Sequence, residues 1–173
     1  MPVAIRTATR EDKDAIAEIL LPMIRAGETY PLPRDMTRAD ALAYWFAPDH
    51  AVFVAEDEGV MLGTYYLRPN QRGGGAHVAN CGYVTARAAE GRGVGRAMCA
   101  HSLARASERG FRAMQFNFVV STNHRAVRLW QQCGFQIVGT LPSAFKHPKL
   151  GDVDAFVMFR SLTLQDATNE GQP

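Results

Sequence analysis

The sequence predicts an α+β fold in which helices cover both faces of a mixed sheet. Three observations support this fold class. Strand-like and helix-like segments follow one another in the irregular order β-α-α-β-β-β-α-β-α-β-β. A glycine-rich turn, residues 90–96, joins an apolar strand to a long helical segment. The chain has 173 residues, of which 47% are hydrophobic and 21% charged, so it can bury the core of one domain.

The chain begins with a predicted strand and a predicted helix. Residues 3–7 alternate between apolar and polar side chains, as a half-buried strand does. A helix is expected to open at residue 9 or 10, which puts Asp12 and Asp14 in its first turn, where carboxylates interact favourably with the helix dipole. Its buried stripe contains Ala15, Ile16, Ile19 and Leu20.

A second helix follows an irregular connection. Residues 26–35 contain a glycine and two prolines and are not expected to be helical. Thr37 then opens the helix, with Asp40 three residues later as a variant of the capping box. Pro48 ends it.

The strands that follow are predicted from apolar runs bounded by turn residues. The run 57–59, Asp-Glu-Gly, marks a hairpin. Residues 69–76 form a glycine-rich loop, and residues 163–173 form a polar tail after a single domain of residues 1–162. The predicted strands cover residues 51–56, 61–67, 78–84, 111–120, 135–141 and 153–159, with a long loop at 142–152.

The most informative stretch is residues 90–96, EGRGVGR, which lies between the strand 78–84 and a helix over 94–108. Such a turn presents backbone N–H groups at a helix N-terminus, where phosphate binds readily, and glycine lets a ligand come close. The phosphate loop of ATPases requires Gly-Lys followed by Ser or Thr, which is absent. A dinucleotide fingerprint requires a third glycine where Arg96 stands. A flexible loop without a ligand remains an alternative.

A second signature follows the glycine turn. Residues 123–130 read NHRAVRLW and precede Gly134-Phe135. Asn123 can cap a helix, apolar residues recur at helical spacing, and Gly134 can end the helix in a left-handed conformation. Together the two stretches resemble the signatures of the GCN5-related N-acetyltransferase (GNAT) superfamily, whose Arg-Gly-x-Gly turn holds the pyrophosphate of coenzyme A. The resemblance covers roughly residues 3–160.

The resemblance implies a mostly antiparallel sheet in which the strand 78–84 is splayed from its neighbour, residues 115–118, so that acetyl-CoA enters between them. The implied cosubstrate is acetyl-CoA, with no metal. Backbone groups of the splayed strand would pair with the pantetheine arm like an added strand, and one N–H would polarise the thioester carbonyl. Gly82 inside this strand fits such a close approach. The expected cofactor contacts are Tyr83, Val84, Thr85, Arg92, Gly93, Val94, Gly95, Arg96 and Asn123.

Three asparagines, Asn80, Asn117 and Asn123, are candidates for the reaction centre. The first two interrupt apolar strands, and a buried amide requires partners, either a neighbouring backbone group or a ligand. The chain resembles one branch in particular, the L-azetidine-2-carboxylate and proline-analogue acetyltransferases. The segments concerned are 80–83 (NCGY), 116–119 (FNFV) and 122–123 (TN), with Trp130. The resemblance assigns Asn80 to substrate binding, and Asn117 and Asn123 to catalysis where the substrate meets the thioester.

Two residues depart from the superfamily pattern. Glu90 stands where many members have Gln or Arg, and its carboxylate must point away from a pyrophosphate. Trp130 replaces a Tyr that often protonates the leaving thiolate, and an indole N–H is not such an acid, so we interpret Trp130 as a packing residue. Asn123 or water would then serve the thiolate. Glu28 and His77 are candidate general bases, although an α-amine titrating near 8 could rely on a water chain.

Two loops are expected to border the substrate. Residues 28–33, ETYPLP, lie where the superfamily covers the substrate mouth, which makes Glu28 and Tyr30 expected substrate contacts; a rigid proline-ordered connection is the alternative. The loop segment 146–149, with two lysines and His147, could attract an anionic substrate or be solvated.

Composition restricts the partners and the compartment. The net charge of +2 is too small to indicate nucleic-acid binding. The three cysteines, Cys81, Cys99 and Cys133, form no disulfide framework, and no apolar run has the length of a membrane span. We therefore expect a cytoplasmic protein. The resemblance implies that it is an enzyme acting on a small-molecule amine, with a homodimer as a possible assembly. The alternatives are a protein or peptide N-acetyltransferase and a non-catalytic acyl-CoA-binding module.

Overall fold

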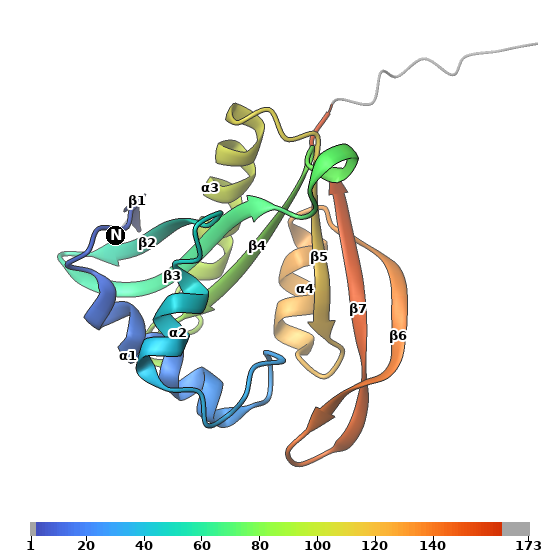
Figure 1. Cartoon of the computed structure of the whole chain (residues 1–173), viewed down its shortest axis with the longest axis horizontal. Helices are drawn as coiled ribbons and strands as arrows, with labels where there is room; N and C mark the ends of the chain where they lie inside the picture. The colour runs from blue at the N-terminus through green and yellow to red at the C-terminus, as the bar shows by residue number, and fades with distance from the viewer. Residues whose placement is uncertain (1–2, 164–173) are drawn as a thin grey trace, which may run out of the picture.

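The computed structural model describes residues 3–163, which form one seven-stranded sheet flanked by four α-helices (Figure 1). The strand order is β1-β2-β3-β4-β5-β7-β6. The strands are β1 (Ala4–Thr7), β2 (Ala51–Asp57), β3 (Val60–Pro69), β4 (Val78–Thr85), β5 (Ala113–Val120), β6 (Gln136–His147) and β7 (Gly151–Ser161). The helices are α1 (Lys13–Ala26), α2 (Arg38–Trp45), α3 (Val94–Glu108) and α4 (His124–Gln132), with short 3-10 turns η1 (Gly73–Gly75) and η2 (Arg87–Ala89).

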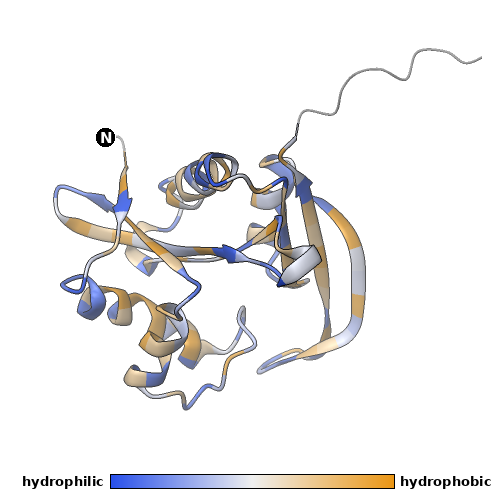
Figure 2. Cartoon of the chain, turned by 45° about the horizontal axis from the view of Figure 1, so that its top comes forward, coloured by the Kyte–Doolittle hydropathy of each residue, from blue (hydrophilic) through white to orange (hydrophobic). Residues whose placement is uncertain are grey.

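The sheet is mixed and mostly antiparallel, as predicted. The pair β4–β5 is parallel, and every other neighbouring pair in the described sheet is antiparallel. Helices α1 and α2 bury one face of the sheet, where they enclose Val54 and Tyr66, and α3 and α4 bury the other, where they enclose Tyr65 and Leu67. Figure 2 shows the helices on both sides of the sheet. The predicted α+β class is confirmed.

Local signals place most helix ends correctly. Thr37 caps α2 by accepting a bond from the Asp40 N–H at 3.1 Å, and its hydroxyl donates to the Asp40 carboxylate at 2.6 Å. Helix α1 begins later than predicted, at Lys13. The reason is that the Asp12 carboxylate accepts the Thr9 N–H at 2.6 Å and is held by Arg6, which stabilises a turn before the helix.

The last two strands are longer than predicted. The expected loop at 142–152 shrinks to residues 148–150, because β6 continues to His147 and β7 begins at Gly151. Pro142 lies inside β6 without breaking the sheet, since β6 is the edge strand and its register with β7 shifts between Leu141 and Phe145. The long β6–β7 hairpin therefore brings His147 and its turn beside the loop that joins α1 to α2.

The described part of the chain contains no helix that is long and apolar enough to cross a lipid bilayer. The predicted polar tail, residues 163–173, lies outside the described residues apart from its first residue.

Candidate active site

Strands β4 and β5 separate after two residue pairs. Val78 faces Ala113 and Ala79 faces Met114, and beyond these pairs β4 stays with β3 while β5 stays with β7. β5 carries a bulge after Phe116 as it follows β7. Figure 1 shows the two strands diverging toward their C-terminal ends. The predicted splay is therefore present, and it leaves one edge of β4 without a strand partner.

The strand register decides which backbone groups face this free edge. The Ala86 N–H donates to the Leu62 carbonyl at 2.8 Å, which fixes the alternation of hydrogen-bonded pairs between β3 and β4. By that alternation, Tyr83 and Thr85 direct their N–H and C=O groups toward the splay. The backbone groups of Val84 bond to β3 instead.

A tyrosine from the loop between α1 and α2 reaches the free edge. The Tyr30 hydroxyl donates to the Tyr83 carbonyl at 3.1 Å, and its ring lies 6.5 Å from that of Trp45. Burial raises the pKa of Tyr30, so the hydroxyl stays protonated and acts as a hydrogen-bond donor. The structure thus brings Tyr30, an expected substrate contact, to the strand edge where the thioester is expected.

The glycine turn leads from β4 into α3 as predicted. Gly91 and Gly93 adopt φ values of 80° and 78°, which glycine tolerates best. A Cβ atom built on either glycine would have no neighbour within 4 Å, so the outer side of the turn is open. Gly93 is the N-cap of α3 and offers no side chain, which leaves the first N–H groups of the helix, including those of Val94 and Gly95, available to an anion.

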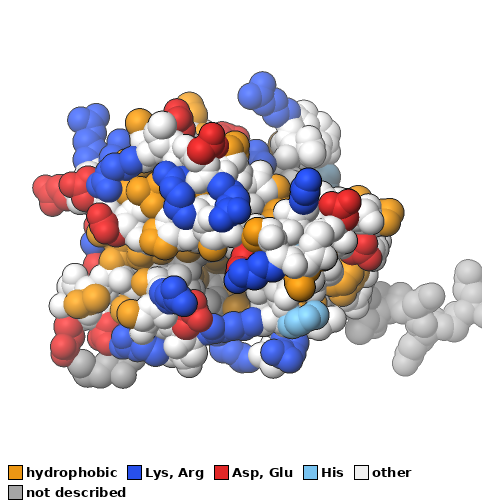
Figure 3. Space-filling model, turned by 90° about the horizontal axis from the view of Figure 1, so that it is seen from below, with side chains coloured by type: hydrophobic (Ala, Val, Ile, Leu, Met, Phe, Trp, Pro, Cys, Tyr) orange, Lys and Arg blue, Asp and Glu red, His pale blue; other side chains and the backbone are white. Residues whose placement is uncertain are grey.

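The charged side chains around the turn are held by neighbours. Arg92 bonds Asp57 at 3.0 Å, and Arg96 donates to Gln132 in α4 at 2.8 Å. Glu90, the residue that departs from the superfamily pattern, pairs with Arg125 at the start of α4 at 2.8 Å. The Glu90 carboxylate is therefore paired with a cation. Lys and Arg side chains are spread over the end of the molecule to which β4 and β5 point, with Asp and Glu side chains among them (Figure 3).

The candidate asparagines fall into two groups. Asn80 Nδ2 donates to the Gln115 carbonyl at 2.9 Å, where β5 has just lost its backbone partner in β4. Asn117 accepts from Gln115 Nε2 at 2.8 Å and donates to Asn70 Oδ1 at 2.6 Å. These amides lie together at the vertex of the splay, on the face covered by α1 and α2. Asn123 lies apart and caps α4 through the Ala126 N–H at 3.2 Å.

The two loops expected to border the substrate are joined by an ion pair. Lys149 in the β6–β7 turn bonds Glu28 in the α1–α2 loop at 2.7 Å. The hydrogen bond and charge of Lys149 lower the pKa of Glu28, which makes it a weaker base. His147 is buried and accepts the N–H groups of Lys149 and Leu150 through Nδ1. The ion pair therefore links the α1–α2 loop to the β6–β7 turn.

The remaining titratable or reactive side chains near β4 are poorly suited to proton transfer or nucleophilic attack. His77 is exposed just before β4, at the end where β4 is still paired with β5. Burial raises the pKa of the Cys81 thiol to about 12, so it is not a ready nucleophile. Trp130 is 9% exposed, with its ring 4.8 Å from Tyr83 and 5.0 Å from Phe116, which supports the packing role.

Sequence reasoning missed four residues of this region: Arg68, Asn70, Gln115 and Arg125. Arg68 and Asn70 occupy the end of β3 and the residue after it, beside the amides of the splay. A polar run at the end of an apolar strand predicts that its side chains are exposed to solvent. It does not predict which residues they contact. Their contacts depend on strand register and on residues 12 to 47 positions away in the chain.

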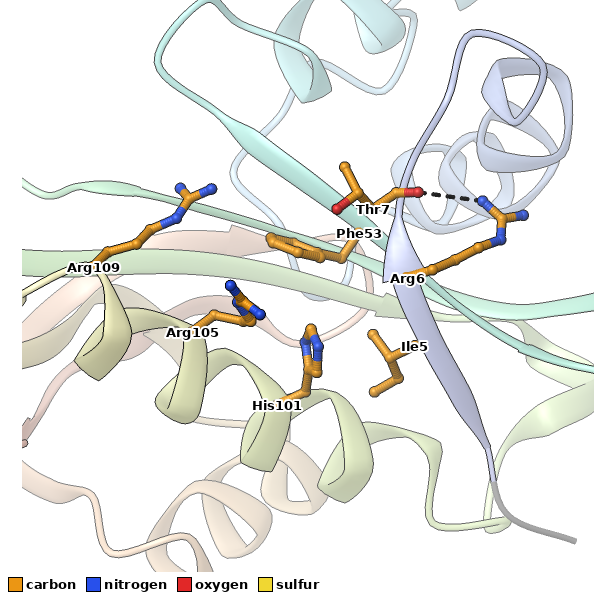
Figure 4. Close-up of a pocket in the computed structure, with 7 residues that line it drawn as sticks. All are labelled: Ile5, Arg6, Thr7, Phe53, His101, Arg105 and Arg109. Carbon is orange, nitrogen blue, oxygen red and sulfur yellow. Dashed lines mark hydrogen bonds between the residues drawn. The ribbon is translucent and has the colours of Figure 1, made fainter.

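A separate pocket of about 200 Å³ lies between β1, β2 and α3 (Figure 4). Its lining includes Ile5, Phe53 and His101, and none of its residues belongs to the free edge or the glycine turn. Figure 4 shows its arginines pointing in different directions, with Arg6 and Arg109 at opposite sides. It is not part of the candidate site.

Comparison with known proteins agrees with this geometry. A model of the acetyltransferase (GNAT) family matches residues 14–135. The N-acetyltransferase aca1 of Schizosaccharomyces pombe is 30% identical over 162 residues, which cover 83% of this chain and 78% of aca1. A GCN5-related N-acetyltransferase from Kribbella flavida is 43% identical, with a TM-score of 0.87 over 92% of this chain and 97% of its own.

A more distant structure has the same fold. The GNAT superfamily phosphinothricin acetyltransferase (Pat) of Sinorhizobium meliloti, solved in complex with AcCoA, is 21% identical, with a TM-score of 0.83 over 99% of this chain and 95% of its own. The family model spans more than half of the chain, and the fold and the glycine turn agree with it. The chain therefore belongs to the acetyltransferase (GNAT) family.

Proposed function

We propose that this protein transfers the acetyl group of acetyl-CoA directly to the amine of a small molecule, an amino acid or proline analogue. The observation that carries the proposal is the free edge of β4, which leads straight into an open glycine turn. An extended pantetheine arm requires unpaired backbone groups, and a pyrophosphate requires unpaired N–H groups. The splay offers unpaired strand groups, and the turn that follows it along the chain offers unpaired N–H groups. The residues present therefore fit this cosubstrate.

The chain's own groups then have distinct tasks. The free N–H of Tyr83 and the free N–H and C=O groups of Thr85 would hold the pantetheine arm, and the turn from Gly91 to Gly95 would hold the pyrophosphate. A backbone N–H on the free edge would donate to the thioester oxygen, which gains negative charge as the amine adds. The amine nitrogen bonds to the carbonyl carbon, the C–S bond breaks and CoA thiolate leaves. Asn123, at the start of α4, is assigned to the thiolate side.

We assign the proton lost by the amine to water, because neither candidate base is placed to take it. Glu28 is paired with Lys149, and His77 lies at the far end of β4.

A small acceptor is favoured over a peptide by the border of the site. The Glu28–Lys149 ion pair links the α1–α2 loop to the β6–β7 turn. An extended peptide would have to cross this link to reach the face of the sheet that α1 and α2 cover. The amides of Asn80 and Asn117 lie on the same face, and Asn80 keeps one N–H beyond the bond to Gln115. We assign that N–H to the acceptor carboxylate and the Asn117 amide to the reaction centre.

The test is thiol release from acetyl-CoA with amino acids, proline analogues, polyamines and peptides as acceptors. We expect small cyclic or branched α-amino acids to be the best substrates. In Asn80→Ala, the KM for the amino acid should rise about ten- to a hundredfold, because a bond to a charged group is lost, while the KM for acetyl-CoA stays close to that of the parent.

Preference for an acceptor without a free carboxylate would contradict the substrate assignment. Tight binding of acetyl-CoA with no thiol release for any amine would instead identify a binding module.

A further inference from the structure

An arginine at the end of β3 lies next to the asparagine assigned to the substrate. Arg68 faces Asn80 in the β3–β4 register, so their side chains lie on the same face of the sheet. The Arg68 Nε donates to Asn80 Oδ1 at 3.4 Å. The Arg68 side chain is 31% exposed, which leaves its guanidinium open to a ligand.

The charge of Arg68 is only weakly compensated. The carboxylate facing it is Asp49, whose Oδ2 lies 3.8 Å from Nη1, beyond hydrogen-bond distance, and whose side chain is 55% exposed. His50 lies nearby, with its ring stacked on Tyr66 at 4.0 Å between centroids. Burial lowers the pKa of His50, so the neutral imidazole is favoured and adds no positive charge beside Arg68. Neither Nη atom forms a hydrogen bond within residues 3–163. The Nη N–H groups of the guanidinium therefore remain available to bind a ligand.

Lys149, a cation of the loops that border the substrate, is already tied to Glu28 at 2.7 Å. An asparagine amide alone carries no charge to balance a carboxylate, whereas a guanidinium offers two parallel N–H groups in the geometry of its two oxygens. Asn80 is three residues before Tyr83, roughly 10 Å along the strand at 3.3 Å per residue. Arg68 can thus hold the carboxylate end of an acceptor while its amine lies near the free edge.

We infer that Arg68 binds the α-carboxylate of the acceptor beside the remaining N–H of Asn80, and that Asn80 Oδ1 orients the guanidinium. This rests on the proposed function and deepens it, because it makes a free carboxylate, rather than a small size, the feature that the enzyme recognises. Asp49 competes with the substrate for the same cation. The acceptor class is therefore a free amino acid and not its amide or a peptide-linked residue.

The test uses the full chain, with L-azetidine-2-carboxylate and its carboxamide as acceptors, or the best amino acid of the panel and its carboxamide. In Arg68→Met, the KM for the acid should rise about ten- to a hundredfold, with the KM for acetyl-CoA unchanged. The activity on the carboxamide, low in the parent, should not change. Arg68→Lys should give an intermediate KM for the acid, because it keeps the charge and loses the fork.

Two further variants complete the design. Asp49→Asn should lower the KM for the acid by up to about fivefold, since it removes an exposed competing carboxylate. Arg10→Met, which removes an exposed arginine before α1, is the matched control and should leave both KM values unchanged.

The outcomes separate the inference from the function on which it rests. An unchanged KM for the acid in a folded Arg68→Met protein would overturn the role of Arg68 and leave the acetyltransferase proposal intact. Equal activity of the parent on acid and carboxamide would overturn it too. If the parent acetylates only polyamines or peptides, the proposed substrate class fails and the inference fails with it.

Discussion

Replacing Gly93 by alanine is expected to raise the Kd for acetyl-CoA by at least about tenfold, or 1.4 kcal/mol. Gly93 has a φ of 78°, and a Cβ atom there would project into the open side of the turn, with no protein atom within 4 Å. That open side is where we place the pyrophosphate. A methyl group would keep the ligand away from the N–H groups at the start of α3. Calorimetric titration of acetyl-CoA measures the effect.

The other end of the same helix supplies the control. Gly110 has a φ of 81°, and a Cβ atom added there would also have no neighbour within 4 Å. Gly110→Ala therefore meets the same backbone strain, about 1–2 kcal/mol, away from the turn. Its Kd for acetyl-CoA should match that of the parent. An equal loss of affinity in both variants would show that the strain, and not the turn, is responsible.

Gly82→Ala is expected to lower the free energy of unfolding by about 1–3 kcal/mol. The added Cβ would lie 2.5 Å from Cε1 of Tyr66, which is too close for any real contact. The Tyr66 ring has no room to retreat, because His50 stacks on it at 4.0 Å and Trp45 meets it edge-on at 4.9 Å. Glycine at this position thus makes room for a core ring. Urea unfolding measures the effect.

A second strand glycine provides the comparison. At Gly139 in β6 the nearest atom to an added Cβ is Val157 Cβ at 3.9 Å, an ordinary contact. Gly139→Ala should therefore unfold close to the parent. If Gly82→Ala is as stable as the parent, Tyr66 is not what requires the glycine.

Features set by neighbouring residues could be predicted from the sequence. The cap of α2 depends on Thr37 and Asp40, three residues apart, and the glycine turn depends on one continuous run. Both appear as predicted. The β6–β7 hairpin could not be predicted to its full length, because Pro142 indicates a loop by local rules. Whether proline is tolerated depends on β6 being the edge strand, which is a property of the whole sheet.

The candidate site shows the same difference between features set by neighbouring residues and features set by the whole sheet. The turn and the Asn123 cap follow from local sequence, and both are present. The partner of Glu90 is Arg125, 35 residues away, and the partner of Asn80 on β5 is the backbone of Gln115, 35 residues away. Such contacts depend on where β4 and β5 separate. The resemblance to known acetyltransferases predicted the splay. It did not predict the alternation of hydrogen-bonded pairs that joins the backbone of Val84 to β3.

The most direct test of the account is amide hydrogen exchange at β4, followed by NMR with and without acetyl-CoA. The central claim is that the pantetheine arm adds to the free edge as a strand would. The N–H groups of Tyr83 and Thr85 should exchange rapidly in the free protein and at least about tenfold more slowly in the complex, because each gains a hydrogen bond or is covered. The N–H of Val84, bonded to β3, should be protected in both states. Saturating acetyl-CoA that leaves Tyr83 and Thr85 unprotected would contradict the claim.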